Sequence, residues 1–142
     1  MNNPILKGIL AVLAGVFIGG MVNYGLIVIS SSIIPPPAGA DLKTLEGLKA
    51  AMHLMEPKHF LMPFLAHAIG TLVAAFVASS IADTYKIRYA LGISAWFLIG
   101  GILNILMLPS PTWFTLTDLI GAYLPFGYMG YLLSIRFIAK EK

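Results

Sequence analysis

Apolar residues form four long runs along the chain, at about residues 5–34, 59–82, 89–108 and 113–137. Each run is long enough to cross the hydrocarbon core of a membrane, which needs about 20 helical residues. The alternating pattern of a membrane β-barrel strand is absent, so the runs are expected to be helices that satisfy their own backbone hydrogen bonds. The pattern therefore predicts an all-α integral membrane protein, a four-helix transmembrane bundle that forms a single domain over residues 1–142.

The longest polar stretch lies between the first two runs. Three consecutive prolines at positions 35–37 end the first helix. Apolar residues then recur at spacings of three and four over residues 41–55, which is typical of a short amphipathic helix. We expect Asp41 to cap this helix, and the helix to lie on the outer membrane surface or over the bundle. Its apolar residues are Leu42, Leu45, Leu48, Met52 and Met55.

Small residues gather on one face of each predicted span, and large apolar residues on the other. Helices in lipid associate through close backbone approach and polar pairing, so the small faces are expected to point inward. For the last span this face is expected to hold Asp118, Ala122, Pro125 and Met129, with Pro125 bending the helix. The candidates for helix packing are Gly15, Gly19, Gly70, Gly100 and Gly101.

The Gly15–Gly19 pair admits two interpretations. It can pack against another helix of the same chain, or it can form a dimer face. We favour packing within the chain, and a homo-oligomer stays open as the alternative.

Composition agrees with a lipid-exposed protein. The chain is 58% hydrophobic and only 11% charged, whereas a soluble domain carries about 25% charged residues. The net charge of +3 comes from basic residues at the ends of the apolar runs, which points to membrane orientation rather than nucleic acid. The absence of cysteine excludes disulfide and thiol chemistry.

The distribution of lysine and arginine predicts the orientation. If the helices alternate, six basic residues fall on one side and three on the other. Because positive charge is retained in the cytoplasm, both termini are expected inside, in a bacterial inner (plasma) membrane. The first run is far longer than the core of a signal peptide, so we expect a retained span. The inner residues are Lys7, Lys86, Arg88, Arg136, Lys140 and Lys142, and the outer ones are Lys43, Lys49 and Lys58.

Polar residues inside the spans suggest a site. By position along their helices, Asn23, His67, Asn104 and Asp118 all fall in the outer half of the membrane, on the small faces. An intramembrane carboxylate needs a partner or a cavity, and His67 is the expected partner of Asp118. The structural alternative places Asp118 among lipid headgroups and satisfies His67 with the His59 carbonyl, which Pro63 leaves without its helical donor.

Metal, cofactor and enzymatic chemistry find little support. His53, Glu56 and His59 are weak candidates for a metal site, because Pro57 interrupts any helix across them. A bis-histidine haem needs two facing intramembrane histidines, and only His67 qualifies, so no cofactor is expected. No arrangement of a nucleophile and a base is visible, which makes an enzyme the less favoured class.

Two functions remain. The first is a scaffold or accessory subunit that acts through helix–helix contacts, with the lipid bilayer and a larger membrane complex as partners. The second is binding or transport of a small molecule or proton through an outward-facing cluster around His67 and Asp118. The sequence slightly favours the first, because a buried histidine in a small bundle is more often structural.

Overall fold

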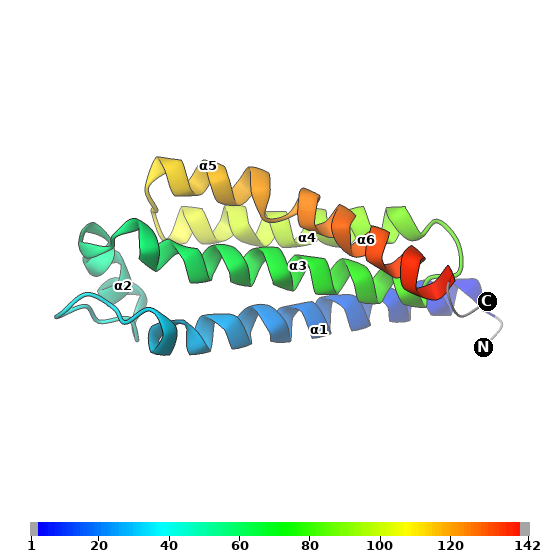
Figure 1. Ribbon diagram of the computed structural model, residues 1–142, viewed down its shortest axis with the longest axis horizontal. Coiled ribbons are helices and arrows are strands. Elements are labelled where there is room, and N and C mark those ends of the chain that lie inside the picture. Colours follow the sequence, from blue (N-terminus) through cyan, green and yellow to red (C-terminus); the bar gives the residue numbers. More distant parts are fainter. Residues whose placement is uncertain (1–2, 140–142) are drawn as a thin grey trace.

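The computed structural model describes residues 3–139, and this part of the chain is all-helical (Figure 1). Lys140 and Lys142, which contribute to the predicted orientation, lie outside the described residues. The α-helices are α1 (Pro4–Ile33), α2 (Leu45–Ala51), α3 (Leu61–Ile81), α4 (Lys86–Met107), α5 (Thr112–Gly121) and α6 (Leu124–Ala139), with two short 3₁₀ helices, η1 (Met52–Leu54) and η2 (Pro57–Phe60).

Three helical segments are long and apolar enough to cross a membrane: Pro4–Ile33, Pro57–Ile81 and Lys86–Met107. The prediction of one continuous fourth helix over residues 113–137 is wrong, because the chain turns at Ala122 and Tyr123 between α5 and α6. Pro125 has no amide hydrogen to bond to the Gly121 carbonyl, which accounts for the break at this point. That α5 and α6 cross together stays a prediction.

Helix α3 occupies the centre of the bundle and packs against α1, α4 and α6. The start of α1 and the end of α6 lie at one end of the molecule, here called the terminal end (Figure 1). Helix α2 lies at the opposite end, here called the loop end.

Glycines allow α1 and α3 to approach closely. A methyl group at Gly15 would lie 2.7 Å from the Ala74 carbonyl oxygen, and one at Gly19 would lie 2.6 Å from the Gly70 carbonyl oxygen. Both neighbours are backbone atoms, so no larger residue fits without separating the helices. In the structure this pair therefore packs within the chain, and both glycines are buried against α3.

The two glycines predicted to pack on α4 differ. Gly101 lies against the Tyr123 side chain, as a packing residue should. Gly100 is exposed, and an added methyl group would meet no atom of the described residues within 4 Å, so Gly100 packs against no other helix among them.

The inward face of α6 differs from the predicted one. Pro125 and Met129 are exposed, whereas Gly127 meets Ser94 and Gly130 meets the backbone of Leu72 on α3. The turn before α6 changes the rotation of α6 about its axis. The inward face that was predicted for a continuous helix therefore applies only as far as Ala122.

The loop-end helix is shorter than predicted. It spans Leu45–Ala51 and continues as η1, and its cap is Thr44, whose hydroxyl oxygen accepts the Gly47 amide at 3.0 Å. Asp41 lies before the cap and accepts the Lys43 amide and the Thr44 hydroxyl, which lower the pKa of its carboxyl. Of the two predicted positions, the side chains of Leu48 and Met52 favour the one over the bundle, because they line a cavity within it.

Candidate functional site

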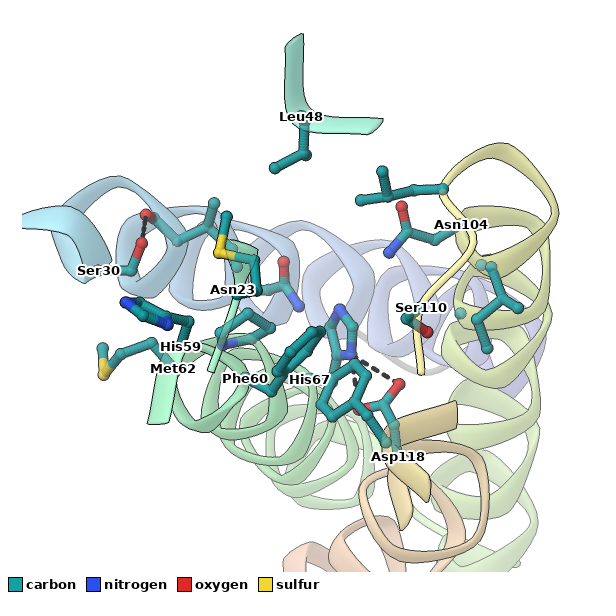
Figure 2. Close-up of a pocket in the computed structure, with 18 of the residues that line it drawn as sticks. Asn23, Ser30, Leu48, His59, Phe60, Met62, His67, Asn104, Ser110 and Asp118 are labelled. Atoms are coloured by element: carbon teal, nitrogen blue, oxygen red, sulfur yellow. Dashed lines mark hydrogen bonds and ion pairs between the residues drawn. The ribbon is translucent and has the colours of Figure 1, made fainter. Parts of the chain in front are cut away.

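A cavity of about 780 Å³ lies near the loop end, between α1, α3, α4 and α5 (Figure 2). The four polar residues singled out by the sequence, Asn23, His67, Asn104 and Asp118, all line it. They come from four different helices, one from each wall. The structure thus brings these side chains to one place.

His67 and Asp118 form the centre of the site. The His67 Nδ1 atom lies 2.8 Å from Asp118 Oδ1 and 2.9 Å from Oδ2. Asp118 is 1% exposed, so it does not lie in a solvated headgroup region as the structural alternative supposed. Nor does the His67 side chain use the His59 carbonyl; its recorded partner is the carboxylate.

Tyr123 completes the arrangement and was not singled out by the sequence. Its hydroxyl donates to Asp118 Oδ2 at 3.0 Å, and its ring stacks on the His67 ring with centroids 5.6 Å apart. On a continuous helix, a residue five positions after Asp118 would lie about 140° away around the axis. The turn at Ala122 and Tyr123 returns the ring to the site, and Pro125 is the only sequence signal of that turn.

The hydrogen bonds fix the orientation of the imidazole. Because a carboxylate accepts, Nδ1 carries a hydrogen and donates to Asp118. The other ring nitrogen, Nε2, has no hydrogen-bond partner among residues 3–139. Figure 2 shows the Asn23 and Asn104 carboxamides pointing into the cavity on either side of the His67 ring.

The two asparagines are also available to a ligand. Within the described part of the chain, neither carboxamide makes a hydrogen bond to another protein group. Asn104 is exposed on α4, and Asn23 is partly buried next to Gly70. A polar group placed between them and Nε2 would find donors and acceptors on three sides.

The rest of the cavity wall is mainly apolar. No lysine, arginine or glutamate of the described residues lines it, and Asp118 is its only carboxylate. Several aromatic side chains line it, among them Phe60, Phe97 and Phe114. Such a site suits a ligand that is mostly apolar and carries a small polar group.

The weak metal candidates do not form a site. In residues 3–139 no group of three or more His, Cys, Asp or Glu side chains could hold a metal ion. His59 Nδ1 accepts the Glu56 amide at 2.9 Å, and its Nε2 lies 3.2 Å from the Pro35 carbonyl oxygen. The Glu56 carboxylate pairs with Lys58 at 2.9 Å, which lowers its pKa. His59 therefore ties the proline turn to the start of α3.

Comparison with known proteins adds no assignment, since no family model, curated protein or solved structure matches the chain.

Proposed function

We propose that this protein binds a small amphipathic molecule in the loop-end cavity, with His67 Nε2 as the principal polar contact. The observation that carries the proposal is the fixed imidazole: Asp118 and Tyr123 hold it on one side, and Nε2 is left unpaired at the cavity wall. Ligand sites commonly combine an apolar wall with a few oriented polar groups in about 300–1,000 Å³.

A purely structural role for the pair explains less. A hydrogen bond that ties α3 to α5 needs His67 and Asp118 alone. It does not need a cavity of about 780 Å³ or two carboxamides without a partner at its wall. A concave space of this size, with a few polar groups left without partners at its wall, is the usual form of a ligand site.

Binding is favoured over passage across the membrane. At the terminal-end side of the cavity, Gly15 of α1 lies against Ala74 of α3 and Ile93 of α4. These contacts fill the interior of the bundle directly below the cavity, where α1, α3 and α4 meet. This favours the binding part of the small-molecule prediction over the transport part.

The test follows the His67 ring itself. We would incorporate the protein, labelled with ¹⁵N-histidine, into lipid nanodiscs and record its imidazole signals by NMR. The chain has three histidines, and His67→Gln identifies the signal of interest. The probes are 1-monopalmitoylglycerol, hexadecyl phosphate and hexadecyltrimethylammonium, which have similar chains and uncharged, anionic and cationic heads.

At least one probe should shift the His67 signal saturably and leave that of His53 unchanged, because His53 is exposed and does not line the cavity. If no probe shifts the His67 signal, or if all shifts rise linearly with probe, the proposed function is wrong.

A scaffold or accessory-subunit role is the second proposal. It is supported by the many large apolar side chains that face outward, among them Phe17 and Tyr24 of α1. Gly15 and Gly19 pack against α3 of the same chain, which weakens the case for self-association, because this pair is the sequence feature that suggests a dimer face. Co-purification of a stoichiometric membrane partner in mild detergent would support this role.

A further inference from the structure

A groove between α1 and α4 adjoins the cavity on its terminal-end side. The groove has a volume of about 650 Å³ and shares two lining residues, Val16 and Trp96, with the cavity. Most of its wall is apolar. Its residues are Val12, Leu13, Val16, Phe17, Arg88, Tyr89, Gly92, Ile93 and Trp96.

The groove is open to the side of the bundle. Its walls include Leu13, Phe17 and Trp96, which are all more than half exposed. A methyl group added at Gly92 would have no atom within 4 Å, so the missing side chain leaves a gap in the α4 wall. An apolar chain could therefore lie there and remain in contact with the bilayer.

The cavity, which is the more polar of the two adjoining spaces, offers no partner for a charged head group. Among the described residues that line the cavity there is no lysine, arginine or glutamate to pair with an ionic head group. The basic residue of the groove, Arg88, lies in the first turn of α4, far from Asn104 on the same helix, and its guanidinium lies over the Tyr85 ring. Asp118 is already paired with His67 and Tyr123. A charged head would lose its hydration there without gaining a counter-ion, which is costly inside a membrane. Hydroxyl and carbonyl groups, in contrast, match imidazole and carboxamide partners.

We propose that the ligand is an uncharged single-chain lipid, whose hydroxyl- or carbonyl-bearing head contacts His67 and whose chain lies in the groove past Gly92. This inference rests on the proposed function and names its ligand class. Along α4, Gly92 lies nine residues before Gly101, which lines the cavity. That is about 13–14 Å along the helix axis, so a long chain is required to fill both spaces.

The experiment uses the same nanodiscs, the same His67 signal and a groove-filling variant, Gly92→Leu. The matched control is Gly25→Leu, which adds the same side chain at another open glycine that lines neither space. 1-Monopalmitoylglycerol should bind more tightly than hexadecyl phosphate or hexadecyltrimethylammonium. Its affinity should fall about tenfold or more in Gly92→Leu and stay unchanged in Gly25→Leu, while the short 1-monohexanoylglycerol binds both variants and the wild type equally.

Two results would overturn the inference and leave the proposed function standing. Equal or tighter binding of a charged probe would show that the head-group argument is wrong. Equal affinity of 1-monopalmitoylglycerol for Gly92→Leu and the wild type would show that the groove holds bulk phospholipid chains only. If no probe moves the His67 signal, the proposed function fails and this inference falls with it. Circular dichroism of Gly92→Leu checks its fold, which should persist because the new side chain meets open space.

Discussion

At the scale of single residues, the burial of one carboxylate shapes the site. Asp118 is 1% exposed, and its two oxygens receive hydrogen bonds from His67 Nδ1 and the Tyr123 hydroxyl. A buried charge is tolerated only when it is paired and hydrogen-bonded, so each of these three side chains depends on the other two.

Asp118→Ala should therefore destabilise the bundle. It leaves the His67 N–H and the Tyr123 hydroxyl without their acceptor, and breaking such a buried pair costs about 3–5 kcal/mol. The matched control is Asp83→Ala, which removes a partly exposed ion pair with Lys7 worth at most about 1 kcal/mol. Unfolding followed by circular dichroism in detergent measures both. Equal losses for the two variants would contradict the central role of Asp118.

Tyr123→Phe is a milder change at the same place. It deletes the hydrogen bond to Asp118 and keeps the ring stacked on His67, so we expect a loss of about 0.5–2 kcal/mol. Because the hydroxyl helps to hold the carboxylate, the His67 signal should also shift in the ligand-free protein. Tyr128→Phe, at an exposed ring on α6, should change neither stability nor the signal. An unshifted His67 signal in Tyr123→Phe would remove Tyr123 from the site.

At the scale of elements, contact between α1 and α3 depends on residues without side chains. Gly19→Leu would force a side chain against the Gly70 carbonyl and Ala74, and overpacking of this kind costs about 1–3 kcal/mol. Gly25→Leu on the same helix meets open space and should be neutral. A disulfide between cysteines introduced on α1 and α3 should form readily in Gly25→Leu and slowly in Gly19→Leu. Equal rates would mean that the close approach is not needed.

The sequence predicts some of these elements better than others. Length and apolarity are enough for α1, α3 and α4, because a lipid-exposed backbone has few alternatives to helix. The rotation of α6 about its axis could not be predicted, because it depends on the turn at Ala122 and Tyr123. The spacing of small residues was followed through Pro125 as if the helix were continuous, and this assumption misses the turn. The same turn explains why His67 and Asp118 were found as candidates and Tyr123 was not. Asn23 and Asn104 could be placed by depth alone, whereas the cavity between them required coordinates.

At the scale of the whole molecule, the predicted orientation can be tested directly. The chain contains no cysteine, so single cysteines can be introduced without background. In intact cells, Lys49→Cys and Pro109→Cys at the loop end should react with a membrane-impermeant maleimide. Tyr85→Cys and Phe137→Cys, near the terminal end, should react only after the cells are opened. If the maleimide labels Phe137→Cys in intact cells, as it labels Lys49→Cys, then α5 and α6 do not cross the membrane together.

The positions of the two open sides of the site determine from where a ligand would enter. Leu48 and Met52 line the cavity at the loop end, while the groove beside Gly92 is open to the side of the bundle. A molecule that enters sideways is drawn from the two-dimensional pool of the bilayer, so occupancy follows mole fraction in the membrane and not millimolar amounts in the medium. Adding nanodisc lipid at constant total probe lowers the mole fraction of the probe and should then empty the site.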